Sequence, residues 1–145
     1  MSHDTSVDPR GLRFAAAITA AVLAIVLVVP SPLREILLAA QVAVFAVSAS
    51  VGLSASPYSW LFRRVVRPRL GAPAALEDAR PPRFAQIVGL AFTLVGLVAL
   101  LAGATAAGLV AVAFAFAAAL LNATTGFCLG CELYLTTRRL ASQLS

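Results

Sequence analysis

The sequence predicts an all-α membrane protein with four transmembrane helices, folded as one integral membrane domain over residues 1–145. Of these residues 61% are hydrophobic and 12% are charged, whereas a water-soluble domain is about half apolar and about a quarter charged. So few polar side chains cannot cover the apolar surface, so lipid must cover it. The same composition excludes a disordered chain.

The four spans follow from the charge-free stretches. A bilayer-crossing helix needs about 20 apolar residues, and residues 14–33, 36–62 and 85–127 carry no charge. The last stretch is long enough for two crossings, with a turn near Gly103 and Gly108. We therefore predict spans near residues 14–29, 36–53, 85–102 and 106–124. The Pro30-Ser31-Pro32 turn ends the first span because proline cannot continue a helix. A cleavable signal peptide is the disfavoured alternative, because this segment lacks a small-residue cleavage site and three more spans follow.

Arginine placement predicts the orientation. Ten of the eleven arginines lie at the amino end, in loop 54–84 or at the carboxyl end, and only Arg34 lies on the other side. Basic residues collect on the cytoplasmic side, so we expect both termini and loop 54–84 to be cytoplasmic, in a bacterial inner (plasma) membrane. The net charge of +5 thus reflects topology. Nucleic acid is not an expected partner, because no aromatic stacking platform accompanies these arginines.

The loop after the second span contains a predicted interfacial helix. Ser56-Pro57 is a favourable helix start, and Pro68 is expected to end the helix. Apolar residues recur between them at helical spacing while arginines lie off that stripe, which is typical of a helix lying in the membrane interface. Tyr58 and Trp60 are expected at headgroup level.

The first and third spans are preceded by the same pattern. Residues 8–15 and 78–85 both read D-x-R-x-x-R-F-A, matching at five of eight positions. Both copies would enter the membrane from one side, so we predict a parallel repeat of two hairpins. Two interpretations of the shared residues stay open: similar interface anchors, or an Asp–Arg network that joins the two helix starts.

The same offset aligns Tyr58 with Cys128 and Leu61 with Cys131, and so predicts a second short interfacial helix after span four. Helix-start signals lie just upstream, at Asn122, Thr124, Thr125 and Gly126. Asn122 is the strongly polar side chain expected deepest in a span, where it would cap a helix or bond between helices.

Cys128 and Cys131 form the one constellation with evident chemistry. On the cytosolic side a stable structural disulfide is disfavoured, and this spacing is typical of redox or metal chemistry. In the first turn of a helix, Cys128 would have a lowered thiol pKa and act as the nucleophile. Cys131 would be the resolving thiol, Glu132 would exchange a proton, and Gly130 would leave room for a partner chain.

Two other interpretations of the cysteines stay open. They could be inert small core residues, or they could bind metal. Zinc and iron–sulfur sites usually need four ligands, and the only histidine, His3, is not expected to contribute. We therefore predict no cofactor and no metal site. A metal ion or an iron–sulfur cluster would need a homo-oligomer whose second subunit supplies another cysteine pair.

Four-span membrane oxidoreductases of the disulfide-bond and vitamin K type are similar in having a Cys-x-x-Cys, but they relay electrons through an additional cysteine pair. This chain has no further cysteine. A soluble thiol partner would therefore exchange with Cys128 and Cys131 directly. No residue of the sequence points by itself to onward transfer to a quinone.

The chain resembles a family of small bacterial membrane proteins that is described only as a domain of unknown function. The segments that carry the resemblance are Val7-Asp8-Pro9-Arg10 with Arg13-Phe14, Pro57-Tyr58 with Leu61-Phe62-Arg63, Pro82-Arg83-Phe84-Ala85-Gln86, and Leu121-Asn122 with Gly126-Phe127-Cys128-Leu129-Gly130-Cys131-Glu132-Leu133-Tyr134. The resemblance implies four spans and an association with thioredoxin-like and sulfurtransferase proteins. It implies no established activity.

The leading hypothesis is an inner-membrane thiol–disulfide or persulfide redox protein that exchanges with such a partner. Arg10, Arg13, Arg80 and Arg83 would attract an anionic sulfur species or the partner's acidic face, although lipid headgroups explain the same arginines. The alternatives are a non-enzymatic membrane anchor or scaffold with structural cysteines, and a small assembly or transport subunit. Spans without charge argue against ion coupling.

Overall fold

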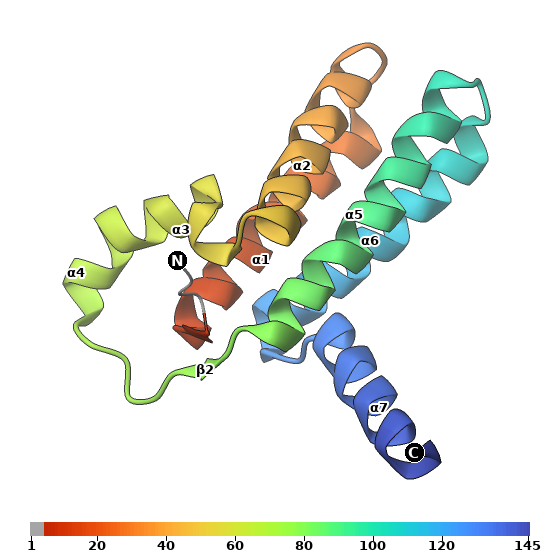
Figure 1. Cartoon of the computed structure of the whole chain (residues 1–145). Coiled ribbons are helices and arrows are strands. Elements are labelled where there is room, and N and C mark those ends of the chain that lie inside the picture. The colour runs from red at the N-terminus through yellow and green to blue at the C-terminus, as the bar shows by residue number, and fades with distance from the viewer. Residues whose placement is uncertain (1–4) are drawn as a thin grey trace.

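The computed structural model describes residues 5–145 and is almost entirely helical (Figure 1). Four long helices dominate it, and all four are long and apolar enough to cross a membrane. Their bounds are α1 Pro9–Val28, α2 Leu33–Ser50, α5 Arg80–Leu101 and α6 Thr105–Thr125. The predicted all-α class with four spans is confirmed, and the protein is a multi-pass membrane protein.

The shorter elements lie before, between and after the two helical hairpins. They are the strands β1 Ser6–Val7 and β2 Glu77–Asp78, the 3₁₀ turn η1 Leu53–Ala55, the helix α3 Pro57–Leu61, the π-helix η2 Phe62–Val66, the helix α4 Arg67–Leu70 and the carboxyl-terminal helix α7 Leu129–Leu144.

Helices α1 and α5 begin five residues before the predicted span boundaries. Asp8 is the N-cap of α1, and its side chain accepts the backbone N–H of Arg10 at 3.0 Å. At the start of α5, Asp78 accepts the backbone N–H of Arg80 at 2.9 Å. Prolines in the first turn need no hydrogen-bond acceptor there. The arginines therefore lie inside the first turns rather than outside the helices, and the absence of charge did not mark the helix starts.

The two hairpins pack side by side, with α1 against α6 and α2 against α5 (Figure 1). Gly103, with a φ of +89°, makes the tight turn between α5 and α6, as predicted. Gly108 instead lies inside α6, where it allows close approach to Gly96 on α5: a Cβ on Gly108 would lie 2.9 Å from the Gly96 carbonyl oxygen. Small residues thus bring these two helices together, as is common in membranes.

The tightly packed core lies toward the end of the bundle that carries the two hairpin turns. Its buried residues come from all four long helices: Leu23, Val26, Leu38, Leu100, Val112 and Ala115. The opposite end, where α1 and α5 begin, carries Arg10, Arg13, Arg80 and Arg83, and we call it the arginine end. The core thus closes one end of the bundle.

The segment after α2 is helical, as predicted, but it does not end at Pro68. Ser56 caps α3, and its Oγ accepts the N–H of Tyr58 at 3.2 Å. A wide turn then pairs the N–H of Arg67 with the carbonyl of Phe62. This π-helical turn precedes Pro68, which lies at the start of α4 where its missing N–H is tolerated. The helix ends only at Gly71, which has a φ of +78°.

Trp60 is exposed and lies 5.5 Å from the Arg64 guanidinium. Tyr58 was expected at headgroup level beside it, but its hydroxyl donates a 2.6 Å hydrogen bond to Oε1 of the buried Gln41 on α2. The Tyr58 side chain therefore points into the bundle, and its burial raises the pKa of the phenol. The helical spacing of Tyr58 could not distinguish an interface from a bundle interior, because both favour an apolar ring with a polar tip.

The two helix starts are joined through the backbone. Strand β1 pairs antiparallel with β2, with Ser6 opposite Asp78 and Val7 opposite Glu77. The Asp–Arg pairs stay within each copy of the repeat: Arg10 bonds Asp8 at 2.9 Å and Arg80 bonds Asp78 at 2.7 Å. A two-residue ladder, rather than a crossing Asp–Arg network, therefore links the repeats here.

A helix follows α6, as predicted, but it has 16 residues and is not short, and the residues expected to start it belong to the end of α6. Thr124 and Thr125 donate their hydroxyls to carbonyls one turn back in α6. Gly126, with a φ of +80°, terminates that helix, which is the usual role of a glycine in a left-handed conformation. The new helix, α7, begins only at Leu129.

Candidate functional site

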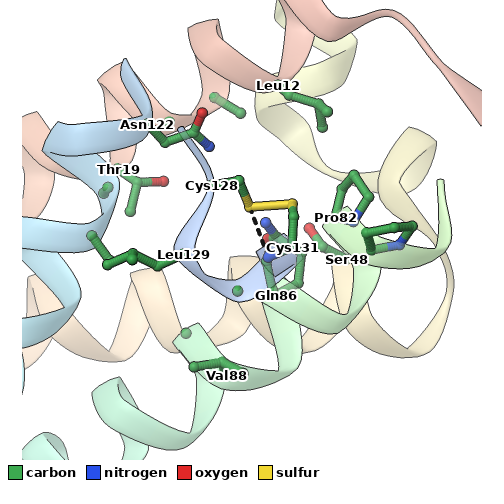
Figure 2. A pocket seen from close by; sticks show the side chains of 18 of the residues that line it. Leu12, Thr19, Ser48, Pro82, Gln86, Val88, Asn122, Cys128, Leu129 and Cys131 are labelled. Carbon is green, nitrogen blue, oxygen red and sulfur yellow. Dashed lines mark hydrogen bonds between the residues drawn. A yellow bond between two sulfur atoms is a disulfide. The ribbon is translucent and has the colours of Figure 1, made fainter. Parts of the chain in front are cut away.

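The two cysteines are joined by a disulfide at the start of α7 (Figure 2). Their Cα atoms lie 5.1 Å apart. Cys128 is the N-cap residue, one position before the first turn rather than in it, and its Sγ accepts the N–H of Cys131 at 3.1 Å. Both residues are half-buried. Two residues between the cysteines thus let both sulfurs meet across one turn.

Helix α7 is held against α5 immediately beside the disulfide. A Cβ on Gly130 would lie 2.5 Å from the Ala85 Cβ, and the ring of Tyr134 lies 5.7 Å from that of Phe84. The expectation that Gly130 leaves room for a partner chain is wrong. Its missing side chain is used for the close approach of α7 to α5 within this chain.

The disulfide lies on the wall of a cavity of about 920 Å³ between the two hairpins. All four long helices and α7 line this cavity, and Figure 2 shows the disulfide among side chains from several of them. Along α5 the lining residues run from Pro81 to Phe92, which is about 16 Å at 1.5 Å per residue. The cavity therefore extends from the arginine end toward the middle of the bundle.

Two amide side chains reach the cavity wall, Gln86 from α5 and Asn122 from α6. Within residues 5–145 neither side-chain amide makes a hydrogen bond to a protein group. The expectation that Asn122 caps a helix or bonds between helices is therefore wrong. Gln86 was missed, although the sequence offered a signal: it is a second strongly polar residue in the charge-free stretch 85–127.

The two repeats carry equivalent aromatic contacts near the starts of α1 and α5. Phe14 lies 5.7 Å from Phe62 at an interplanar angle of 49°, and Phe84 lies 5.7 Å from Tyr134 at the same angle. Tyr134 of α7 therefore takes the place of Phe62.

In that register the N-cap Cys128 takes the place of the N-cap Ser56, and Cys131 that of Ser59. All four residues line the cavity. The sequence alignment of Tyr58 with Cys128 was thus two residues out of register. The second hairpin is longer than the first and the link after α6 is shorter than the link after α2, so the offset found before the spans does not persist after them.

Glu132 lies in the first turn of α7, is exposed and lines the cavity near the disulfide. An acidic residue in a first turn is favoured by the helix dipole. This position would also let a carboxylate exchange protons with solvent near the sulfurs, and its proton-transfer role stays a prediction.

Arg13 and Arg83 each bind the carboxyl end of a helix in the other repeat. Arg83 of α5 donates to the carbonyls of Ala49 and Ser50, both at 2.8 Å. Arg13 of α1 makes the same kind of contact with the last turn of α6. Helix-end carbonyls lack partners within their helix, so both guanidinium groups act as helix caps.

Arg10 and Arg80 bind the aspartates two residues before them, and Arg10 also donates to the Gly71 carbonyl at 2.9 Å. The Arg80 guanidinium lowers the pKa of Asp78 to about 2. Hydrogen bonds from Arg10 likewise hold the pKa of Asp8 below its usual value. All four arginines expected to dock an anion or a partner thus gather at one end of the bundle, and docking itself stays a prediction.

Within residues 5–145, no three His, Cys, Asp or Glu side chains lie close enough together to hold a metal ion. His3 lies outside the described residues. A cluster shared between two subunits, as the sequence leaves open, would need the reduced cysteines of both.

A family model described as "Domain of unknown function (DUF4395)" matches residues 7–139. No curated protein and no solved structure matches the chain.

Proposed function

Because the chain belongs to the DUF4395 family, whose description names no activity, we propose a function from the geometry of the chain itself. The protein is an inner-membrane thiol–disulfide redox protein, and it exchanges through Cys128 and Cys131 with a soluble thioredoxin-like or sulfurtransferase partner. The observation that carries this proposal is the disulfide at the N-cap of α7, half-buried at the arginine end.

Helix geometry favours the exchange chemistry of Cys128. In the oxidised protein the Cys128 Sγ accepts the N–H of Cys131. In the reduced protein the unpaired N–H groups and the dipole of a 16-residue helix would stabilise a thiolate at the same position. Cys128 is therefore the nucleophile in our proposal and Cys131 the resolving thiol.

The exchange consists of two balanced steps. A thiolate of the partner attacks the Cys128 Sγ, the Cys128–Cys131 bond breaks, and Cys131 leaves as a thiolate that takes up a proton. The partner's second thiolate then attacks its own sulfur in the mixed disulfide and releases Cys128 as a thiolate. Two electrons pass to this protein, and the partner becomes a disulfide. The reverse sequence oxidises this protein.

A sulfurtransferase partner would use the same nucleophile differently. The Cys128 thiolate would attack the terminal sulfur of the partner's persulfide, forming a persulfide on Cys128 and leaving the partner as a thiolate. Cys131 could then displace that sulfur as hydrogen sulfide and re-form the disulfide. Both variants of the proposal need Cys128 accessible from the aqueous side.

The arginine distribution supports a cytoplasmic location of the site. The disulfide lies at the end of the bundle that carries ten of the eleven arginines, and such residues collect on the cytoplasmic side of a bacterial inner membrane. Both termini would then be cytoplasmic, where a soluble thiol partner is available.

Trapping the partner tests the proposal. In cells that produce the Cys131→Ser variant, Cys128 should form a stable mixed disulfide with a thioredoxin-like or sulfurtransferase protein, which reducing agent releases. Cys128→Ser is the matched control and should trap far less, because the backbone N–H at the helix start is directed at the Cys128 sulfur and not at that of Cys131. Equal trapping by both variants, or trapping by neither, contradicts the proposal.

One observation favours a second candidate, a non-enzymatic membrane anchor with structural cysteines. The disulfide adjoins the tight contact of Gly130 with Ala85, so it could serve to fix the start of α7. A bridge across so short a loop stabilises a fold by about 2 kcal/mol in the chain-entropy estimate. An anchor would show that loss of stability upon chemical reduction and no exchange with a thioredoxin-like or sulfurtransferase protein. No specific observation favours an assembly or transport subunit.

A further inference from the structure

We propose that the cavity beside the disulfide binds a lipid-soluble quinone, and that this quinone oxidises the Cys128–Cys131 dithiol. The inference rests on the proposed redox function and adds its electron acceptor. It is argued from three features of the cavity: its place and size, its polar groups, and the difference between the two repeats.

The place and size of the cavity suit a membrane-soluble ring compound. The cavity measures about 920 Å³, within the range of roughly 300–1,000 Å³ that is usual for small-molecule sites. It is lined by spanning helices as far as Phe92 and Phe114, and its wall near the arginine end carries the disulfide. A ligand that enters from the bilayer would therefore reach the sulfur atoms without crossing water.

Its polar groups suit a diketone. The side-chain amides of Gln86 and Asn122 reach the cavity, and within residues 5–145 neither is bonded to a protein group. An amide N–H can donate to a quinone carbonyl, and an amide oxygen can accept from a hydroquinone hydroxyl. Apolar side chains, among them Phe45, form much of the remaining wall. The ring would contact this apolar wall, and its two oxygens would bond the amides.

Among the described residues, only the second repeat places cysteine and amide side chains on the cavity wall. Gln86 follows the shared Arg-Phe-Ala sequence at the position that Ala16 occupies in the first repeat. Asn122 directly precedes the carbonyls that Arg13 caps, as Ser48 directly precedes those that Arg83 caps. The equivalent residues Ala16 and Gln86 line the cavity, and so do Ser48 and Asn122.

At the starts of α3 and α7, Ser56 and Ser59 of the first repeat correspond to Cys128 and Cys131 of the second. Four differences between the repeats thus place two amides and two sulfurs on the walls of one cavity. Packing alone does not require this combination, because the first repeat packs with alanine and serine at the same positions.

The redox step balances. The two thiols of Cys128 and Cys131 lose two protons and two electrons as their sulfur–sulfur bond forms. The quinone gains both electrons and two protons, so its two carbonyl oxygens become hydroxyls. Hydroquinone then leaves for the bilayer, and the disulfide is reduced again by the soluble dithiol partner.

The test uses the full-length protein in lipid nanodiscs, reduced and then freed of reductant. The probe is a benzoquinone with a fully substituted ring and a short alkyl tail, because full substitution prevents addition of thiols to the ring. Hydroquinone formation is followed by ultraviolet absorbance, and disulfide formation by loss of maleimide labelling. We expect saturable oxidation of one dithiol per quinone, much faster than that of dithiothreitol at equal concentration in the same nanodiscs.

Three variants probe the cavity by giving it residues that the first repeat already has. Gln86→Ala matches Ala16, and Asn122→Ser matches Ser48. Ala119→Phe matches Phe45 and fills space. Each amide variant should raise the half-saturating quinone concentration several-fold, and Ala119→Phe should lower the rate at saturation or abolish binding. Gln143→Ala, an exposed amide at the end of α7 outside the cavity, is the control and should change neither.

Exchange of each variant with a reduced thioredoxin is measured in parallel, so that two failures can be told apart. If the protein exchanges with thioredoxin but quinone oxidises it no faster than dithiothreitol, the quinone site is wrong and the proposed function stands. Rates that are indifferent to all three cavity variants also overturn the site and indicate a cavity filled by lipid acyl chains. If neither reaction occurs, the proposed function fails as well.

Discussion

The guanidinium of Arg13 donates a 3.1 Å hydrogen bond to the carbonyl of Thr124, 111 positions away in the sequence. The second repeat mirrors this contact, since Arg83 bonds the carbonyl of Ser50 at 2.8 Å. Each arginine meets the negative end of a helix dipole. The two hairpins are thus tied crosswise, because each one begins with the residue that caps the other.

We expect loss of either cap to destabilise the bundle. Hydrogen bonds that involve a charged group contribute about 1.5–3 kcal/mol, and less where water competes. Arg83 is half-buried and Arg13 is exposed, so Arg83→Ala should lower the free energy of unfolding by about 2 kcal/mol and Arg13→Ala by about 1 kcal/mol. Denaturant unfolding in detergent measures both, and Arg139→Ala at an exposed position is the control. Equal effects of all three variants would contradict the capping role.

Cys128 and Cys131 should differ in reactivity once they are reduced. The N-cap position favours a thiolate at Cys128, whereas Cys131 lies within the helix. In single-cysteine variants, alkylation of Cys128 should remain fast at a pH at which Cys131 already reacts slowly. The rates of iodoacetamide labelling over a pH series give the comparison. Superimposable pH profiles for the two thiols would show that the helix start does not activate Cys128.

The Asp78–Arg80 pair should make stability depend on pH in acid. The pKa of Asp78 is lowered to about 2 in the folded protein, and an unfolded aspartate titrates near 3.9. The stabilisation is therefore fully present above pH about 4 and is lost as the pH falls toward 2. Asp78→Asn should remove this part of the acid dependence and lower stability at pH 7 by the same amount, which is small because the pair is exposed. Thermal unfolding from pH 2 to 7 tests this, and an unaltered acid dependence would contradict it.

Gly130 should tolerate no side chain. A Cβ there would lie 2.5 Å from the Ala85 Cβ and 2.6 Å from its Cα, so α7 would have to move away from α5. We expect Gly130→Ala to destabilise the protein by about 1–3 kcal/mol and to weaken the contact of Tyr134 with Phe84. Gly11→Ala is the matched control, since its Cβ would meet only a side chain, that of Phe62, at 3.1 Å and no backbone atom. Equal stability of the two variants would show that α7 is not held at this point.

The equivalence of the two caps predicts a second disulfide. Ser56 and Ser59 lie at the positions that Cys128 and Cys131 occupy in the other repeat, and both face the cavity. In a Cys128→Ser/Cys131→Ser background, Ser56→Cys with Ser59→Cys should form an intramolecular disulfide upon mild oxidation. Loss of two maleimide-reactive thiols per chain, without dimer formation, reports it. Thiols that stay free would show that only the α7 cap permits the bond.

The sequence was sufficient for the class of the fold, because length and absence of charge determine which segments cross a bilayer. It also identified the repeat and the turn at Gly103. It placed the starts of α1 and α5 too late, because Arg13 and Arg83 lie inside these helices, where they cap other helices. A charged residue indicates where a segment leaves the lipid. It does not show that the side chain will bond the backbone carbonyls of another helix.

The cysteine pair was found from spacing alone, but its surroundings were not. The interpretation of Asn122 as a cap or an interhelical bond failed, because the packing of the hairpins leaves a cavity beside this residue and not a polar partner. Gly130 was assigned to a partner's approach, whereas α5 occupies that space. These contacts depend on how the hairpins are placed relative to each other, and one periodic pattern along the chain does not contain that information.

The packed residues around Leu23, Val26 and Val112 have a consequence for traffic through the membrane. They fill the bundle at the end away from the sulfur atoms, so the cavity between the hairpins is closed at that end. A molecule that enters the cavity has to leave through the arginine end or laterally, between the helices, into the lipid. The cavity therefore reaches one end of the bundle and does not cross it.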